Sequence, residues 1–198
     1  MLTVRSATDG EIHAVGDLLA AAFEGDPVWS WMAAPSDAWA ERAAGFFRTE
    51  AGLQLRGHGE VLVDDELRGA AVWVQPGRWK TSPRESTPLV GPSLRLFRGR
   101  TVRALRTISL MERRHPVDPP HWYLAILGTH PDHQGKGVGG ALIGAVTERC
   151  DTEGLGAYLE SSKEENVALY ARHGFEVREE LPLPGGPPMW LMWREPRR

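Results

Sequence analysis

The sequence predicts an α/β protein with a mixed central β-sheet and helices on both faces. Apolar residues recur at helical spacing in several segments, and short β-type apolar runs lie between those segments. The expected order of elements is β-α-α-β-β-(α)-β-α-β-α-β-β, which combines a hairpin, crossover helices and a final antiparallel pair. The 198 residues fit one domain, 1–198, with a core of ordinary size.

The N-terminal part is expected to start with a strand over residues 2–7. Thr8 and Glu11 then have the spacing of a capping box, which predicts the start of a helix. The apolar residues of this helix recur at helical spacing, and they are Ile12, Val15, Leu18, Leu19 and Phe23. We expect Pro27 to end the helix, and a second helix to run from about Ser36 into the fifties.

The middle of the chain predicts a hairpin followed by an insertion. Residues 60–64 and 67–74 have the pattern of two strands, and the Pro- and Gly-rich residues 76–92 are expected to form a loop. An amphipathic helix bent near Gly99 follows, marked by Leu94, Phe97, Leu105, Ile108 and Met111. Residues 76–120 thus form a loop and helix insertion between the third and fourth strands.

The C-terminal half has clearer boundaries. Residues 122–127 are an apolar run of the buried-strand type, and a polar loop, a glycine cluster and a helix to about Cys150 follow. The elements expected after that helix are a strand over 156–160, a helix over 164–173, and an antiparallel pair over 175–181 and 189–194.

The glycine cluster at residues 134–140 predicts an anion site. It lies between a strand and a helix, where backbone N–H groups can point at one ligand. Glycine permits positive φ angles and lets a phosphate approach without a Cβ in the way. The expected anion is a pyrophosphate.

A dinucleotide site is the first alternative for this cluster. Gly135, Gly137 and Gly140 match G-x-G-x-x-G, and Glu160 lies twenty residues further on. However, residues 130–133 separate the glycines from the strand, and too little chain remains for further parallel units. A P-loop fits less well, because Lys136 is followed by glycine rather than Ser or Thr.

Three motifs in order resemble the GNAT acetyltransferases over residues 121–194. Gln134, Gly137 and Gly139 form Q-x-x-G-x-G, residues 127–131 match the end of the fourth strand of that family, and residues 166–175 match N-x-x-x-x-Y-x-x-x-G-F. The resemblance implies the GNAT fold, with a splay between strands four and five, and acetyl-CoA as acyl donor without a metal. The N-terminal half is similar to the puromycin N-acetyltransferase group at residues 20–23 and at Asp26-Pro27.

The resemblance also implies a cofactor site. Its expected residues are Leu127, Gly128, Thr129, Gln134, Gly135, Lys136, Gly137, Val138, Gly139, Gly140, Asn166 and Tyr170. Gly128 fits the bulge that the family has at the end of strand four, and an N–H near Leu127 or Gly128 is the expected oxyanion donor. Tyr170 is the expected acid for the departing thiolate, since a phenol is protonated at neutral pH.

The sequence offers more than one candidate for the general base. Glu160, at a strand end, is either the base or a solvated carboxylate, and His130 and Asp26 are weaker candidates. The H-x-x-H spacing of His130 and His133 lacks a third metal ligand. Cys150 is expected to be a small buried residue, which favours direct transfer in a ternary complex over an acyl-cysteine intermediate.

The acceptor site is expected among Asp26, Trp29 and Trp31, with Trp39 close by, because an aromatic pocket suits a partly apolar amine. Core packing is an equal alternative for each tryptophan. A basic stretch follows, and it is expected to be mainly the solvated face of a helix. Its arginines are Arg95, Arg98, Arg100, Arg103, Arg106, Arg113 and Arg114.

The predicted function is acetyl-CoA-dependent N-acetylation of a primary amine on a small molecule, such as an antibiotic-like or aminoacyl compound. Protein or peptide acetylation and a non-catalytic CoA-binding regulatory module are the alternatives. The net charge of −3 gives no drive toward nucleic acid, and no apolar run is long enough to span a membrane. A single cysteine predicts the cytoplasm, and a homodimer is left open.

Overall fold

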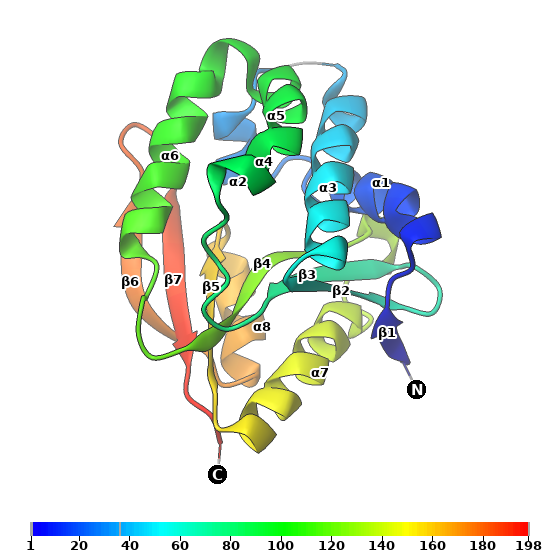
Figure 1. Cartoon of the computed structure of the whole chain (residues 1–198), viewed down its shortest axis with the longest axis vertical. Coiled ribbons are helices and arrows are strands. Elements are labelled where there is room, and N and C mark those ends of the chain that lie inside the picture. Colours follow the sequence, from blue (N-terminus) through cyan, green and yellow to red (C-terminus); the bar gives the residue numbers. More distant parts are fainter. Residues whose placement is uncertain (1, 36, 198) are drawn as a thin grey trace.

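The computed structural model, which describes residues 2–35 and 37–197, contains a seven-stranded mixed sheet (Figure 1). Its strands are β1 (Val4–Ser6), β2 (Gly59–Asp64), β3 (Gly69–Val74), β4 (His121–Thr129), β5 (Gly156–Ser161), β6 (Glu176–Pro182) and β7 (Pro188–Arg194). They lie in the order β1-β2-β3-β4-β5-β7-β6. The β4–β5 pair is parallel and the other pairs are antiparallel, so the predicted mixed sheet is confirmed.

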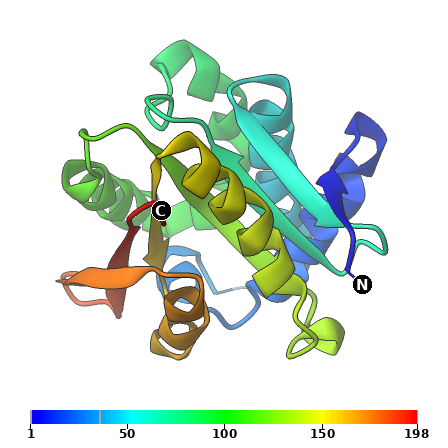
Figure 2. The same ribbon diagram turned by 90° about the horizontal axis from the view of Figure 1, so that it is seen from below.

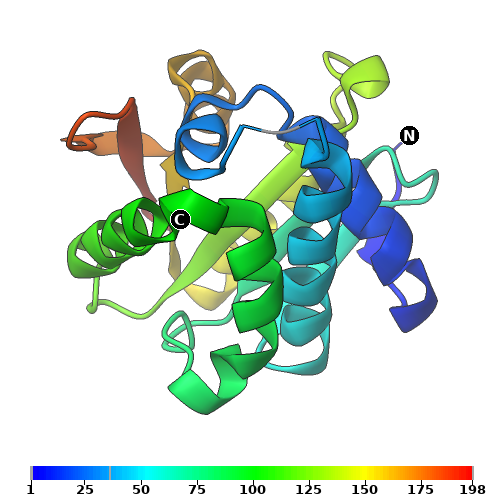
Figure 3. The same cartoon turned by 90° about the horizontal axis from the view of Figure 1, so that it is seen from above.

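Helices cover both faces of the sheet, as expected. One face carries α1 (Ile12–Ala22), α3 (Trp39–Arg56), α5 (Val90–Phe97) and α6 (Thr101–Arg114), seen from above in Figure 3. The other face carries α7 (Val138–Glu153) and α8 (Val167–Arg172), seen from below in Figure 2. The sheet therefore separates two apolar cores. Within residues 2–35 and 37–197, no helix has the length and hydropathy needed to cross a bilayer.

Two features of the N-terminal region differ from the prediction. The capping box is present, with Thr8 N donating to Glu11 Oε2 at 2.8 Å, and a 3₁₀ turn over Asp9–Glu11 precedes α1. However, α1 ends at Ala22, and Pro27 begins a further helix, α2 (Pro27–Met32), instead of ending the first. Proline suits the first helical position, where its missing N–H would have no helical partner. Ser36, the expected start of the second helix, lies outside the described residues.

The predicted loop over residues 76–92 is wrong in part. It contains α4 (Pro83–Ser86), a 3₁₀ turn over Thr87–Leu89 and the start of α5. Ser82 caps α4 in a box with Glu85, a signal that the Pro- and Gly-rich composition hid. The expected bend near Gly99 is confirmed, since a 3₁₀ turn over Arg98–Arg100 separates α5 from α6.

The apolar residues that marked this bent helix do not all face the core. Leu94, Leu105 and Ile108 are exposed at 53%, 60% and 38%. Phe97 is buried as expected, and Leu96 and Ala104 are the other buried apolar positions of α5 and α6. The buried face of α5 and α6 is therefore narrower than the amphipathic pattern predicted.

The strands β4 and β5 diverge toward one end of the sheet (Figure 1). They pair over His121–Leu124 and Gly156–Leu159, and no pairing between them continues beyond those residues. The predicted splay is therefore confirmed. It leaves the later residues of β4 without a neighbouring strand on that side, which places free backbone groups at the opening.

The bulge of β4 is at Ala125, so the predicted bulge at Gly128 is wrong. Leu124 pairs with Trp73 and Ile126 with Val72, which leaves Ala125 as the extra residue. Gly128 pairs regularly with Ala70. Glycine is needed there for another reason, because a Cβ would lie 2.8 Å from Leu19 and 2.9 Å from Ala22 of α1.

Candidate active site

A cavity of about 520 Å³ lies at the splay between β4 and β5. Its lining includes the glycine loop, the unpaired end of β4, residues of α2 and Met111 of α6. Of the residues predicted for the site, those that line it are Asp26, Trp29, Leu127, Gly128, Thr129, Gln134, Gly135, Gly137, Val138, Gly139, Gly140, Glu160, Asn166 and Tyr170. The fold thus brings together segments more than 140 residues apart in the chain.

The glycine loop is shaped to receive an anion. Gly135 and Gly137 have φ angles of +73° and +83°, and Gly137 is the N-cap of the 16-residue helix α7. Residues with side chains rarely adopt such angles, which explains these two glycines. Their Cβ positions are open, since a Cβ on Gly135 would have no atom within 4 Å. Free N–H groups at a helix N-terminus suit a phosphate.

The cations around this loop are only partly those that the sequence predicted. Lys136 does not line the cavity, and its Nζ donates to the Asp132 carbonyl of the same loop at 2.8 Å. Lys163 and Arg172 do line it, and the motif analysis did not single them out. Lys163 follows β5 and Arg172 lies on α8, so only the folded chain shows that both line the same cavity as the glycine loop.

Tyr170 is a buried phenol at the wall of the cavity. Its side chain packs edge-on against Phe175, with 6.2 Å between ring centroids, and the residue is 7% exposed. Burial and the nearby Asp26 carboxylate raise the pKa of Tyr170 above its ordinary value of 10. The hydroxyl therefore holds its proton at neutral pH and is available as a donor.

Asp26 has structural partners for both of its oxygens. Oδ1 accepts from the backbone N–H groups of Val28 and Trp29 at 3.0 Å each, which caps α2. Oδ2 accepts from Ser162 Oγ at 2.5 Å, which ties α2 to the segment after β5. Asp26 is 2% exposed and lines the cavity through this fixed arrangement. A contact between Asp26 and a substrate stays a prediction.

Glu160 is a buried carboxylate, so its interpretation as a solvated strand-end carboxylate is wrong. Its side chain is 3% exposed, and Oε1 lies 3.8 Å from Nδ1 of the buried His115. The hydroxyls of Tyr123 and Tyr158 lie near this carboxylate, and burial together with Glu160 raises the pKa of both tyrosines. A carboxylate held in aromatic surroundings at a cavity wall is able to take a proton from an amine.

The tryptophans divide between the cavity and the outer surface. Trp29 lines the cavity and packs against Phe47 at 4.9 Å between ring centroids. Trp31 lies outside it, because its Nε1 donates to Gly185 O at 2.9 Å and Arg103 stacks over its ring. Trp39 Nε1 donates to Ala20 O. The sequence pattern could not distinguish these three positions.

Cys150 and His130 lie outside the cavity. Cys150 is fully buried, as predicted, and burial raises the pKa of its thiol to about 11. A thiol of that pKa is a poor nucleophile at neutral pH. His130 has a side chain that is 39% exposed and accepts from Asp132 N within its own loop. Neither residue is among those that line the cavity.

Comparisons with known proteins agree with this geometry. The chain is 38% identical over 82 residues to the uncharacterized N-acetyltransferase C550.08 of Schizosaccharomyces pombe, which covers 40% of the chain and 33% of that protein. The chain thus spans about a third of the length of that curated relative. A Corynebacterium glutamicum structure described as histone acetyltransferase HPA2 and related acetyltransferase shares 26% identity, with a TM-score of 0.73 over 100% of this chain and 97% of that one.

A more distant structure shares the fold. The polyamine N acetyltransferase of Drosophila melanogaster, an enzyme that catalyses the formation of N acetylagmatine, is 18% identical, with a TM-score of 0.62 over 98% of this chain and 100% of that one. The family described as Acetyltransferase (GNAT) family matches residues 14–175, which is most of the chain and includes the glycine loop, the splayed strands and Tyr170. The chain belongs to the GNAT acetyltransferase family.

Proposed function

We propose that this protein transfers the acetyl group of acetyl-CoA to a primary amine on a small molecule, by direct attack in a ternary complex. One observation carries the proposal: a single cavity joins the glycine loop to a buried carboxylate beneath aromatic side chains. The first end suits the acyl donor, and the second suits a cationic acceptor. The likeness to puromycin N-acetyltransferases stays a prediction.

The donor end fits acetyl-CoA, which enters the reaction as a substrate. The backbone N–H groups at Gly135, Gly137 and Gly139 would hold its pyrophosphate, since two of these glycines have the positive φ angles of an anion cradle. Lys163 and Arg172 add positive charge in the same cavity. The unpaired end of β4 offers backbone groups to the amide arm of the donor.

The reaction needs one base and one acid. Glu160 takes a proton from the incoming ammonium, and the neutral amine attacks the thioester carbon, so that the C–N bond forms as the C–S bond breaks. Tyr170 donates its proton to the departing thiolate and recovers one from the new amide nitrogen. In total, an ammonium and acetyl-CoA give an amide, CoA with a free thiol, and one proton.

The acceptor end favours an amine with an apolar or aromatic body. Phe23, Trp29 and Tyr123 line the same cavity as Glu160, and Met32 and Met111 add flexible apolar surface. The cation of the amine would meet the Glu160 carboxylate at the same wall. The Drosophila melanogaster relative acts on polyamines, which are small cationic amines, and this is consistent with such an acceptor.

Two other functions remain as alternatives. Protein acetylation is favoured by the description of the Corynebacterium glutamicum neighbour, which names a histone acetyltransferase. The position of the cavity under α2 and Met111 of α6 disfavours a long peptide. A non-catalytic CoA-binding module is disfavoured by the buried acid and base, since binding alone requires neither.

A CoA-release assay tests the proposal. The appearance of free thiol would be followed with arylalkylamines, polyamines, aminoacyl compounds and lysine-containing peptides, each with acetyl-CoA. We expect release with at least one class of small amine, and a loss of about 10²-fold in kcat/KM for Glu160→Gln. Glu176→Gln, at a carboxylate 73% exposed on β6, is the matched control and should keep the wild-type rate. Turnover with peptides alone would favour protein acetylation.

A further inference from the structure

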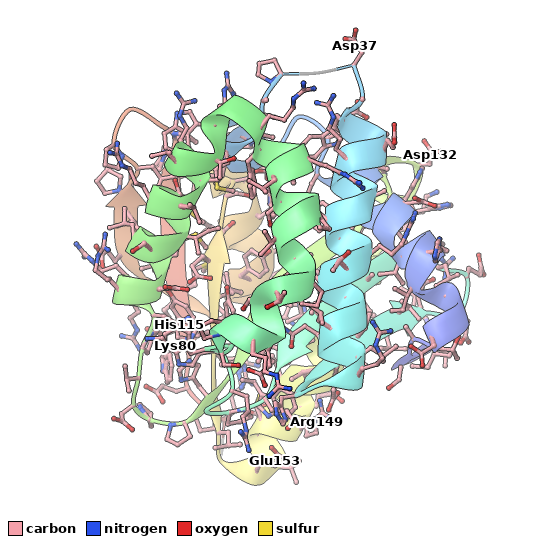
Figure 4. All side chains as sticks on the ribbon, turned by 45° about the horizontal axis from the view of Figure 1, so that its top comes forward. Asp37, Lys80, His115, Asp132, Arg149 and Glu153 are labelled. Carbon is pink, nitrogen blue, oxygen red and sulfur yellow. The ribbon has the colours of Figure 1, made fainter. Side chains whose placement is uncertain are left out.

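A buried chain of side chains leads from Glu160 away from the cavity. His115 Nδ1 lies 3.8 Å from Glu160 Oε1, and His115 Nε2 lies 3.2 Å from His121 Nε2. His121 Nδ1 in turn lies 2.8 Å from the Pro119 carbonyl oxygen. His115 follows α6, where the chain turns toward β4 (Figure 4). Neither histidine was singled out by the sequence motifs.

The hydrogen bonds of this chain determine which nitrogen carries each proton. A carbonyl oxygen only accepts, so His121 must carry its proton on Nδ1. Burial lowers the pKa of His121, which keeps its ring neutral and leaves Nε2 as an acceptor. His115 must then donate from Nε2 to His121. The remaining nitrogen of His115, Nδ1, faces the Glu160 carboxylate.

This arrangement has a consequence for Glu160. If His115 is neutral, the lone pair of Nδ1 points at an ionised carboxylate, which is unfavourable in a buried site. One proton added to the pair removes the conflict, either on Nδ1 as an imidazolium or on Oε1 as a carboxylic acid. The geometry thus leaves one ring nitrogen and one carboxylate oxygen facing each other as the two places for a single proton.

We propose that Glu160 and His115 act as one proton-accepting pair, in which His115 is the positioning residue that shares the proton of the incoming ammonium and His121 fixes its tautomer. This inference rests on the proposed function. The ammonium loses one proton to the pair, the neutral amine attacks the thioester, and the pair releases that proton after acetyl transfer. No further reactant is required.

The other groups around His115 hold its ring without competing for this proton. Trp79, in the loop after β3, stacks on the ring at 4.0 Å between centroids and 22° between planes. Tyr123 of β4 and Tyr158 of β5 meet it edge-on at 4.7 Å each, and their raised pKa values keep both neutral. Glu50 of α3 lies further off near Tyr123, and burial raises its pKa.

Nitrogen-15 NMR of the imidazole rings tests the pair in the protein without substrate. His115→Gln identifies the signals of His115, and the titration is then compared between wild type and Glu160→Gln. We expect the apparent pKa of His115 to fall by about one unit or more in Glu160→Gln, because an opposite charge is lost. His121 should remain in its Nδ1–H form. An unchanged His115 titration, or an Nε2–H form of His121, would overturn the proposal.

The pH profile of kcat/KM supplies the second test. The His115→Gln side chain can still donate to His121 Nε2 but cannot carry the shared proton. We expect kcat to fall roughly tenfold and the acid limb of the profile to move to lower pH by about one unit, because the imidazole that shares the proton is removed. His13→Gln, at an exposed position of α1, is the control and should leave the profile unchanged.

The two tests separate this inference from the function on which it rests. If no amine is acetylated by the wild-type protein, the proposed function fails while the NMR coupling is still measurable. If amines are acetylated but His115→Gln keeps the wild-type profile, the pair fails alone. If His115→Gln does not fold, the His115 signals of the wild type are identified by site-selective histidine labelling. The comparison of the His115 titration between wild type and Glu160→Gln then decides whether the pair exists.

Discussion

Two protonatable side chains share one cavity but lie in different surroundings. Tyr170 lies in an apolar wall beside the Asp26 carboxylate, and both features favour its protonated form. Glu160 lies between two tyrosine side chains and the imidazole of His115, which is the one basic group among them. A difference in surroundings is the means by which a single site can hold both an acid and a base.

Tyr170→Phe tests the role of the phenol. The change keeps the ring and its packing on Phe175 but removes the hydroxyl. We expect kcat and kcat/KM to fall together by about 10²-fold, because the thiolate then lacks its proton donor. Acetyl-CoA affinity, measured by calorimetry, should be nearly unchanged. A folded variant with the wild-type single-turnover rate would show that solvent supplies this proton.

Residues that belong to a local motif could be predicted, and residues that depend on distant packing could not. Gly137 and Tyr170 were predicted from their spacing within short segments, and both line the cavity. His115 lies 45 residues before Glu160 in the chain, and no local pattern links the two. The burial of Glu160 could not be predicted from the sequence either, because a residue at the end of a strand can lie in solvent or in an aromatic pocket.

At the scale of elements, the packing between α1 and α3 depends on the absence of a side chain at one position. A Cβ on Gly16 of α1 would lie 2.8 Å from Arg48 Cβ and 2.9 Å from the Ala44 carbonyl oxygen of α3. Gly144 of α7 is also a helix glycine, but a Cβ there would have Glu148 Oε1 at 3.9 Å as its nearest neighbour. Of these two glycines, only Gly16 has neighbouring atoms so close that a side chain would not fit.

The Gly16→Ala and Gly144→Ala variants therefore form a matched pair. Alanine favours a helix over glycine by about 0.5–1 kcal/mol, so Gly144→Ala should raise the free energy of unfolding by up to about that amount. Gly16→Ala should lower it by about 1–3 kcal/mol, because α1 and α3 must move apart. Urea unfolding followed by circular dichroism measures both. Equal effects of the two substitutions would contradict the close approach.

Helices and strands could be predicted where the spacing of the apolar residues and the residue types at the segment ends indicated the same element. The hairpin of β2 and β3 was predicted within two residues at each end, since its strands are apolar and its turn is polar. The short helices α2 and α4 were missed, because proline was taken as a helix breaker instead of a first helical residue. The bulge at Ala125 had no signal in the sequence, because only the pairing of β4 with β3 defines it.

Three carboxylates have lowered pKa values, and one of them joins distant parts of the chain. The hydrogen bond from Arg5 of β1 lowers the pKa of Glu11 to about 2. Burial alone would raise the pKa of Asp64, but hydrogen bonds from Arg68 and Gly69 lower it. Arg194 of β7 lowers the pKa of Asp151 on α7, with Nη2 2.6 Å from Oδ2. These contacts anchor both ends of the chain.

The Asp151–Arg194 pair gives a pH-dependent prediction for the whole fold. Because the folded pKa of Asp151 is below the unfolded value of about 3.9, its stabilisation is complete above pH 4 and is lost as the pH falls through the folded pKa. Arg194 is 2% exposed, so removing its partner leaves a buried charge with fewer acceptors. Asp151→Asn should lower the free energy of unfolding at pH 7 by about 1–3 kcal/mol.

The decisive measurement is how this difference changes with pH. In urea unfolding at pH 7, 4, 3 and about 2.5, the difference between wild type and Asp151→Asn should be constant down to about pH 4 and then shrink, since protonation removes the same charge from the wild type. Asp17→Asn is the control, because the Asp17 side chain is 66% exposed and pairs with Arg48 only at the surface, where pairs contribute little. A difference that persisted unchanged to pH 2.5 would mean that packing at Asp151, and not its charge, holds β7 to α7.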